Sequence, residues 1–201
     1  IGYIGNLVDE DAITYIPNGI VLDTMHPPEV EKRDPNLIFF IGRLEKRKGA
    51  LYTIKAFEKL KKKNPRVELI IGGDGPLRTS LEAYVERNNI MDVTFTGFMS
   101  DEQKFHYMST CGVYTSPALY GESFGIVLAE AMAFGAPIVA HKNEGYEWVL
   151  QGMGRLSLVD VHDIDAYADR LQLMLEEDQL RKAWQKWAKT YVKQFDYERI
   201  V

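Results

Sequence analysis

The chain has 201 residues, of which 46% are hydrophobic and 26% charged, an ordinary composition for a globular protein of one large domain or two small ones. Its net charge of -5 argues against a nucleic-acid-binding protein, whose affinity comes from neutralising phosphates. The single cysteine, Cys111, excludes an intrachain disulfide and a cysteine-based zinc site, and it suits a reducing cytoplasm.

The sequence predicts a soluble protein. Its most apolar stretch, residues 125–140, is interrupted by Glu130 and Pro137 and is too short to span a bilayer. No signal peptide opens the chain, so we expect a cytoplasmic location. Because the chain starts at Ile1 rather than Met, we expect a fragment whose upstream part holds some of the function.

Two regions are expected along the chain. Residues 1–33, with the turn-forming Pro17-Asn18-Gly19, are interpreted as an interdomain linker, and residues 34–201 as one domain. In that domain we expect strands at residues 37–41, 67–71, 93–96, 113–115, 137–140 and 154–158, and helices at residues 50–63, 76–89, 101–109, 125–134, 144–151, 163–176 and 178–193. This alternation predicts an α/β fold with a Rossmann-like, doubly wound parallel sheet, which binds ligands at the carboxyl ends of its strands.

A basic loop, Gly42-Arg-Leu-Glu-Lys-Arg-Lys-Gly49, follows the first predicted strand. It lacks both the dinucleotide fingerprint Gly-x-Gly-x-x-Gly and the Gly-Lys-Ser/Thr of a P-loop. Arg43, with its planar fork, and Lys48, with its compact charge, are suited to bind a pyrophosphate at this position. A solvated surface loop is the alternative.

A glycine-rich turn, Gly72-Gly-Asp-Gly-Pro76, follows the second predicted strand. Three glycines allow the backbone to approach a ligand closely just before a helix begins, where an anion binds well. A tight turn without a ligand explains the same residues.

Two glutamates, Glu122 and Glu130, lie within the otherwise small and apolar segment 119–140. An unpaired carboxylate in a protein interior is costly, so each requires a partner. At a helical rise of ~1.5 Å per residue the two lie roughly 12 Å apart, farther than the carboxyl pair of a glycosidase and suited to a ligand held at both ends. Free N–H groups where a helix starts near Gly125 favour a phosphate or sugar oxygen. In the alternative, Glu122 caps that helix and Glu130 pairs with a neighbouring base.

No metal site is predicted. Asp163-Ile-Asp165 looks like the Asp-x-Asp metal motif of some sugar transferases, but it directly precedes a helix, where an N-cap is the expected role. The histidines, His26, His106, His141 and His162, show no metal-ligand spacing, and no function is assigned to them.

Taken together, "GRLEKRKG", "IIGGDGP" and "GESFGIVLAEAMAFGAPIVA" resemble, in this order, the C-terminal domain of retaining GT-B glycosyltransferases of the group 1 family. The Glu122 to Glu130 spacing matches that family's E-x7-E motif, and residues 16–19 match the "IPNG" of its interdomain linker. The stretches "GESFGIVLAEAMA" and "MGRLSLVDVHD" are most similar to phosphatidylinositol mannosyltransferases. That similarity implies GDP-mannose as donor, whereas related enzymes use UDP-sugars.

The resemblance implies a role for each motif. The implied catalytic residues are Arg43, Lys48 and Glu122. The implied donor-binding residues are Gly42, Arg43, Lys48, Met99, Asp101, Lys104, Glu122, Phe124, Gly125, Ile126 and Glu130. The two cations would bind the pyrophosphate, Glu130 the ribose, Glu122 and the backbone of residues 124–126 the sugar, and residues 97–104 the base. Transfer would proceed with retention and without a metal, because the cations and helix N–H groups take up the developing charge.

The resemblance also implies what lies outside the chain. The acceptor site belongs to an N-terminal domain that is absent here, so we expect the isolated domain to bind a nucleotide sugar without transferring it. That domain would also make any peripheral contact with the inner face of a membrane. The closing "QFDYERIV" resembles the segment that crosses back to it. A UDP-sugar-dependent enzyme and a non-catalytic nucleotide-binding module are the alternatives, and a dehydrogenase is disfavoured by the missing glycine fingerprint.

Overall fold

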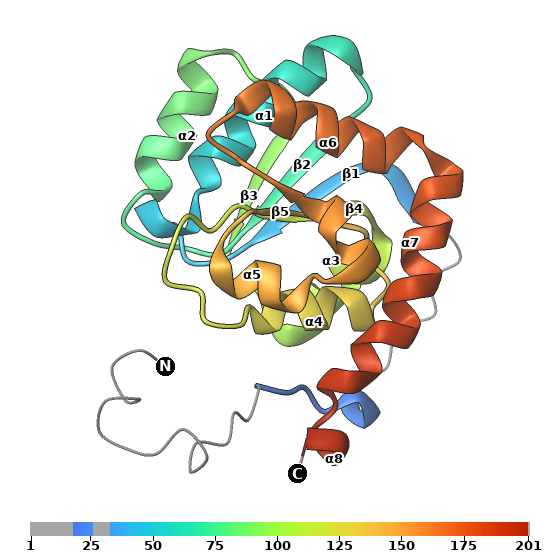
Figure 1. Ribbon diagram of the computed structural model, residues 1–201. Coiled ribbons are helices and arrows are strands. Elements are labelled where there is room, and N and C mark those ends of the chain that lie inside the picture. The colour runs from blue at the N-terminus through green and yellow to red at the C-terminus, as the bar shows by residue number, and fades with distance from the viewer. Residues whose placement is uncertain (1–17, 26–32, 201) are drawn as a thin grey trace, which may run out of the picture.

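A computed structural model describes residues 18–25 and 33–200 of the chain. Within them, one sheet contains six strands in the order β3-β2-β1-β4-β5-β6 (Figure 1). All neighbouring strands are parallel, with Ile41 beside Gly72 and Phe40 beside Thr115. The strands are β1 (Asp34–Ile41), β2 (Glu68–Gly72), β3 (Val93–Gly97), β4 (Cys111–Ser116), β5 (Ile138–His141) and β6 (Leu158–Val159). The predicted doubly wound parallel sheet is therefore confirmed.

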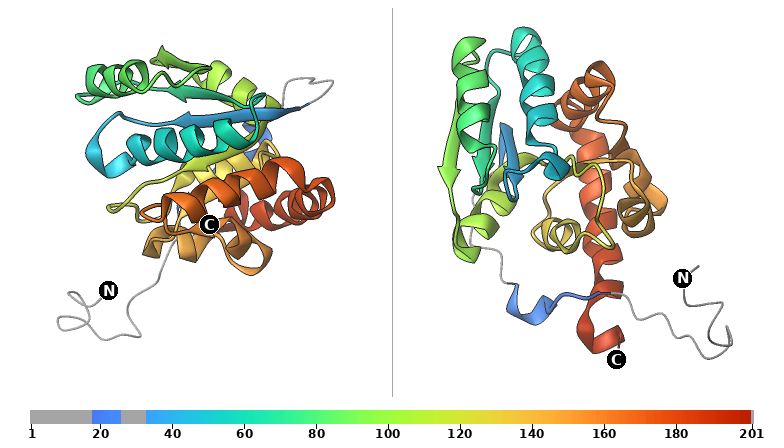
Figure 2. Two further views of the ribbon diagram at one scale, coloured as in Figure 1. Left: turned by 90° about the horizontal axis from the view of Figure 1, so that it is seen from above. Right: turned by 90° about the vertical axis from the view of Figure 1, so that its left-hand side faces the viewer.

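Helices cover both faces of the sheet, as the two views of Figure 2 show. They are α1 (Ala50–Lys63), α2 (Arg78–Arg87), α3 (Asp101–Thr110), α4 (Ile126–Ala133), α5 (Glu144–Val149), α6 (Ile164–Glu176), α7 (Asp178–Tyr191) and α8 (Tyr197–Ile200). On one face α1 contacts α2 and α6, and on the other α3 contacts α4. None of the helices in the described part of the chain combines the length and apolar character that crossing a bilayer requires.

The core lies between the sheet and these two helical layers. Every residue of β4 is buried, and β1 is buried from Leu37 to Phe40. Strands covered on both faces read as continuous apolar runs, which is why these segments show no alternation. Each large side chain that is fully buried, such as Phe39, Phe57 or Trp184, contributes about 1.5–3 kcal/mol by leaving water.

Side chains cap several helices at their N-termini. Ser100 accepts a hydrogen bond from the Gln103 amide at 3.2 Å, and the Gln103 side chain accepts one from the Ser100 amide at 3.0 Å, which completes a capping box. Asp163 accepts from the Ala166 amide at 3.0 Å, so the Asp-x-Asp sequence supplies an N-cap as predicted.

Several element boundaries differ from the prediction, and two of the differences have a clear structural reason. The strand expected at residues 154–158 is mostly a 3-10 helix, Gly152–Ser157, and β6 has only two residues. Gly152 has a φ of +53°, and a Cβ on Gly154 would lie 2.6 Å from the Trp187 ring, so the segment turns against α7 instead of extending. The helix expected from residue 76 begins at Arg78, because residues 76–77 still belong to the preceding turn.

The described part of the predicted linker lies beside the end of the chain (Figure 1). The Ile20 amide donates to the Phe195 carbonyl at 2.8 Å, and the Tyr197 amide donates to the Ile20 carbonyl at 3.0 Å. The rest of the linker, residues 1–17 and 26–32, lies outside the described residues, and Pro17 of the linker motif lies there too.

Candidate functional site

The strand order fixes where a ligand crevice can form. The chain passes outward from β1 to β3 and then returns to place β4 on the other side of β1. Loops that leave the carboxyl ends of β1 and β4 diverge at this point, which is where open α/β sheets bind ligands. These loops are residues 42–49, the basic loop, and residues 117–125, the glutamate loop. A hydrogen bond of 2.7 Å from the Leu119 amide to the Arg47 carbonyl connects them.

The glycine-rich turn after β2 supports the basic loop from behind. The Gly42 amide donates to the Gly72 carbonyl at 3.1 Å, and the Leu44 amide donates to the Asp74 carbonyl at 2.8 Å. A Cβ on Gly73, whose φ is +111°, would lie 2.0 Å from the Gly42 carbonyl oxygen. The close approach of the two loops therefore explains these glycines without a ligand.

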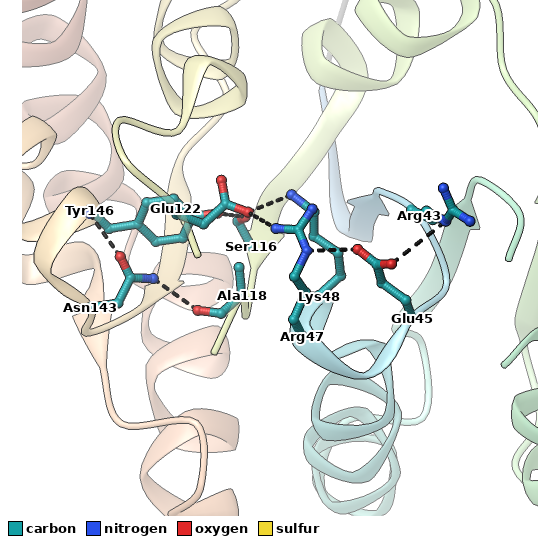
Figure 3. A network of polar contacts seen from close by, with 9 residues as sticks. All are labelled: Arg43, Glu45, Arg47, Lys48, Ser116, Ala118, Glu122, Asn143 and Tyr146. Carbon is teal, nitrogen blue, oxygen red and sulfur yellow. Dashed lines mark hydrogen bonds and ion pairs between the residues drawn. The ribbon is translucent and has the colours of Figure 1, made fainter. Parts of the chain in front are cut away.

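Charged side chains of the basic loop reach Glu122 across the crevice (Figure 3). The Glu122 Oε1 accepts hydrogen bonds from Lys48 Nζ at 2.5 Å and from Arg47 Nη1 at 3.1 Å. Arg47 also pairs with Glu45, with Nε 2.7 Å from Oε1. The Glu122 side chain is only 11% exposed. The largely buried carboxylate of Glu122 thus contacts two cations.

Arg43 lies apart from this contact. Its Nε is 3.6 Å from Glu45 Oε2, and its side chain is 70% exposed at the far end of the network in Figure 3. The structure therefore brings together Lys48 and Glu122, two of the three predicted catalytic residues, and leaves Arg43 at the rim. Arg47 and Glu45 were not singled out from the sequence, although both lie in the basic loop.

The glutamate loop is fixed by α5. The Asn143 Nδ2 donates to the Ala118 carbonyl at 2.8 Å, and the hydroxyls of Tyr146 and Ser116 are 2.7 Å apart. A Cβ on Gly145 would lie 2.1 Å from the Glu122 carbonyl oxygen, so only glycine allows this contact. The position of Glu122 is therefore set by backbone packing as well as by its ion pairs.

Glu122 does not lie on a helix. The estimated distance between Glu122 and Glu130 assumed a helical rise of ~1.5 Å per residue over the whole segment, and this assumption does not hold. Helix α4 begins at Ile126, after Gly125, which has a φ of +79° and makes no side-chain cap. Only Glu130 is helical. The glutamates thus belong to two different segments, and the capping role considered for Glu122 is wrong because its carboxylate binds Lys48 and Arg47 instead.

Glu130 binds a different lysine. Its Oε1 accepts from Lys104 Nζ of α3 at 2.9 Å, and the same ammonium lies 3.0 Å from the Asp101 carboxylate. The pairing of Glu130 with a neighbouring base, considered as an alternative, is therefore present. Its Oε2, however, is buried and has no hydrogen-bond partner among the described residues. A buried carboxylate oxygen without a donor costs about 1–3 kcal/mol.

Two hollows open beside these residues. One of about 390 Å³ is lined by the glutamate loop and by residues of α5 and the turn before it, among them Glu122 and Lys142. The other, of about 550 Å³, is lined by Gly42, Arg43 and Met99 together with residues of the glycine-rich turn. Of the predicted donor-binding residues, Glu122 lines the first hollow, and Gly42, Arg43 and Met99 line the second.

The remaining predicted residues occupy the start of α4. The Phe124 side chain is buried against Trp148 and Phe195, which leaves only the backbone of this residue to contact a ligand. Ile126 is 41% exposed at the first turn of the helix. This arrangement is compatible with the backbone role expected for residues 124–126, which stays a prediction.

Histidines come together where their spacing in the sequence gave no sign of it. His141, at the end of β5, lies near Asp160 and His162, which follow β6. The spacing of the histidines in the sequence could not reveal this cluster, because its members come from the ends of two neighbouring strands that are distant in sequence.

Residues 23–191 match the model of the family described as glycosyl transferases group 1. A phosphatidyl-myo-inositol mannosyltransferase of Mycolicibacterium smegmatis is 36% identical over 92% of this chain and 48% of its own length. An alpha-D-kanosaminyltransferase of Streptomyces kanamyceticus is 31% identical over 74% of this chain and 39% of its own.

Solved structures share the fold. HepE from Anabaena, in complex with UDP and glucose, superposes with a TM-score of 0.82 at 22% identity, over 98% of this chain and 57% of HepE. The chain spans about half the length of the curated mannosyltransferases it matches. The comparison therefore concerns one part of those relatives.

The pairing of Lys104 with Glu130 gives a testable prediction. We expect Lys104→Met to lower the free energy of unfolding by about 1–3 kcal/mol, because it leaves the Glu130 carboxylate without a donor. The double change Lys104→Met with Glu130→Gln should recover part of this loss, since an uncharged amide tolerates burial better. Urea unfolding followed by circular dichroism measures both.

The matched control is Lys62→Met, which removes an exposed i,i+4 partner of Glu58 on α1. Such a surface pair contributes about 0.3–0.5 kcal/mol. Equal losses from Lys104→Met and Lys62→Met would show that the Glu130 contact carries no special weight.

Proposed function

The chain belongs to the family of group 1 glycosyl transferases, and from this membership we propose that it forms the donor domain of a retaining glycosyltransferase that uses a nucleotide sugar. The observation that carries this proposal is Glu130, whose buried Oε2 lacks a hydrogen-bond donor among the described residues. A ribose offers two adjacent hydroxyl donors, and a carboxylate is an acceptor that matches them. The ribose of the donor would supply the hydrogen bond that Glu130 Oε2 lacks.

The cations of the basic loop would bind the pyrophosphate. Lys48 already lies within the crevice, and the exposed Arg43 is free to turn toward a phosphate. Without a ligand, Glu122 neutralises Lys48 and Arg47. A bound pyrophosphate would compete for these cations, and the released Glu122 carboxylate would accept hydrogen bonds from hydroxyls of the sugar. Binding would thus exchange one set of charge contacts for another.

The same groups would assist the reaction. Breaking the bond between sugar and phosphate builds negative charge on the leaving nucleoside diphosphate and positive charge on the sugar carbon. Arg43 and Lys48 would stabilise the first, and N–H groups at the start of α4 would add to it. A metal ion would have no necessary part in this scheme. The transferred unit would be a hexosyl group.

GDP-mannose is the donor we favour. The phosphatidyl-myo-inositol mannosyltransferase of Mycolicibacterium smegmatis, by its name a mannosyltransferase, is more similar in sequence than the alpha-D-kanosaminyltransferase. Asp101 is 82% exposed beside Lys104, so its carboxylate is accessible to the N1 and N2 donors of guanine. The structure of HepE holds UDP and glucose, and it supports a UDP-sugar as the alternative.

The acceptor site would lie outside this chain. Since the curated relatives are about twice as long, a second domain of the full-length protein would bind the acceptor. That domain would form the other wall of the crevice, exclude water from the sugar and make any contact with the inner face of a membrane. A module that binds nucleotides without catalysis is the remaining alternative.

Binding of a nucleoside diphosphate without metal is the first prediction. We expect calorimetry in EDTA to detect binding of GDP or UDP by the folded chain. Arg43→Ala should cost about 1.5–3 kcal/mol, since it removes charged hydrogen bonds to phosphate, whereas Arg66→Ala, an exposed arginine before β2, should cost nothing. No heat with either nucleotide would refute the proposed function.

Preference for guanine is the second prediction. GDP should bind more tightly than UDP, because uracil offers a single N–H where guanine offers the donors of N1 and N2. Asp101→Ala should narrow this difference, and Glu102→Ala, the neighbouring exposed carboxylate, should leave it unchanged. Equal affinities of the unmutated chain for GDP and UDP would overturn the assignment of GDP-mannose and leave the family unaffected.

Absence of transfer by the isolated chain is the third prediction. Positioning an acceptor in line with the sugar carbon accounts for roughly 7–11 kcal/mol of barrier reduction, and we propose that the second domain supplies it. Product formation from labelled GDP-mannose and a lipid or sugar acceptor should therefore require the upstream domain. Comparable turnover with and without that domain would place the acceptor site inside residues 1–201.

A further inference from the structure

Two histidines and an aspartate converge on one point at the end of the sheet beyond the proposed donor site. His162 Nδ1 lies 2.8 Å from Asp160 Oδ1, and His141 Nδ1 lies 3.9 Å from the same oxygen. One ligand atom from each residue lies within 4.8 Å of the other two. None of the three contacts Glu122 or Glu130 in the described network, so the cluster is separate from the donor-binding residues.

The surrounding structure holds the cluster in place. His141 is 8% exposed and ends β5, where it pairs with Val159 of β6. Asp160 Oδ1 also accepts from the His162 amide at 3.0 Å, which fixes the turn between the two ligands. The Tyr52 ring of α1 lies edge-on to His162, with centroids 5.1 Å apart. One buried, rigid ligand thus faces two exposed ones on a short turn.

We propose that His141, Asp160 and His162 form a binding site for a divalent transition-metal ion of the zinc type. Each histidine would supply one imidazole nitrogen and Asp160 one carboxylate oxygen, with water completing the coordination. This donor set suits zinc, cobalt and nickel, whereas magnesium and calcium prefer oxygen ligands alone. The site goes beyond the proposed glycosyl transfer and does not depend on it.

The distances support such an ion. Ligand atoms at 2.0–2.2 Å from a tetrahedral zinc lie about 3.4 Å from each other. The separations of 2.8 and 3.9 Å lie on either side of this value. His162 and Asp160 have side chains 53% and 64% exposed, so they can adjust toward the fixed His141. The contact from the Val161 amide to His141 Nδ1 is long, at 3.3 Å, and is the one that ligation at this nitrogen would replace.

The position of the site indicates a structural role. Strand β6 has only two residues, and its pairing with β5 consists of Ala140 with Leu158 and His141 with Val159. An ion held by residues from the ends of β5 and β6 would link the two strands by coordination bonds, in addition to the few hydrogen bonds of this short strand pair. His141 is followed by residues 142–143, and Asn143 binds the glutamate loop through the Ala118 carbonyl. The metal would therefore stabilise the edge of the sheet that supports this loop.

Thermal unfolding with Zn²⁺ and absorption spectroscopy with Co²⁺ test the proposal. We expect excess Zn²⁺ to raise the melting temperature, EDTA to reverse the rise, and Mg²⁺ to have no effect. Co²⁺ should produce a visible absorption band of the intensity expected for four ligands. His162→Gln, at an exposed position, should keep the metal-free melting temperature and lose the shift and the band. Its affinity should fall by more than the roughly 10- to 100-fold that follows when a residue hydrogen-bonded to a ligand is lost.

His106→Gln is the matched control, because His106 is an exposed histidine on α3 outside the cluster. It should retain the full Zn²⁺ shift. The proposal is overturned if Zn²⁺ gives no shift, or if the shift survives in His162→Gln, since the ion would then bind elsewhere in the chain. Loss of the shift in both His162→Gln and His106→Gln would also overturn it.

Discussion

The reversal of strand order between β1 and β4 is the constraint on which the rest of the structure depends. Parallel strands deliver all their carboxyl ends to one edge of the sheet, and loops at the reversal point leave in opposite directions. Here one of these loops is basic and the other carries a carboxylate, so the topology brings opposite charges face to face. The bond from the Leu119 amide to the Arg47 carbonyl keeps that distance fixed. Chemistry at this edge follows from how the chain winds.

Each glutamate of the crevice is matched by a lysine, but in different ways. Glu122 has its cations on a loop, where they are available to another anion, whereas Glu130 and Lys104 lie on the facing helices α4 and α3. The first pair is suited to exchange partners. The second pair holds the Glu130 carboxylate in one orientation, while its buried Oε2 has no hydrogen-bond donor among the described residues. A crevice of this kind combines an adaptable end with a preformed end.

The sequence predicted the fold because the fold depends on local patterns, and the same patterns indicated the basic loop and the two glutamates of the candidate site. Apolar strands that alternate with segments of helical period predicted the elements in their correct order. The reasoning failed where tertiary contacts decide: Gly154 turns against Trp187 instead of extending, and Glu122 precedes the helix it was placed on. Arg47 was missed because the four cations of the basic loop cannot be told apart before the backbone conformation is known. His141 and His162 were missed because they meet only through the pairing of β5 with β6.

The unsatisfied, buried oxygen of Glu130 would couple binding of the proposed ligand to the stability of the protein. A desolvated acceptor raises the free energy of the ligand-free state, and a hydroxyl that binds there removes this penalty in addition to its own contacts. The folded state then gains most in cells where such a ligand is plentiful. When the ligand is scarce, a larger fraction of the molecules is unfolded at any moment and open to proteases. The concentration of substrate would thus affect the abundance of the protein as well as its activity.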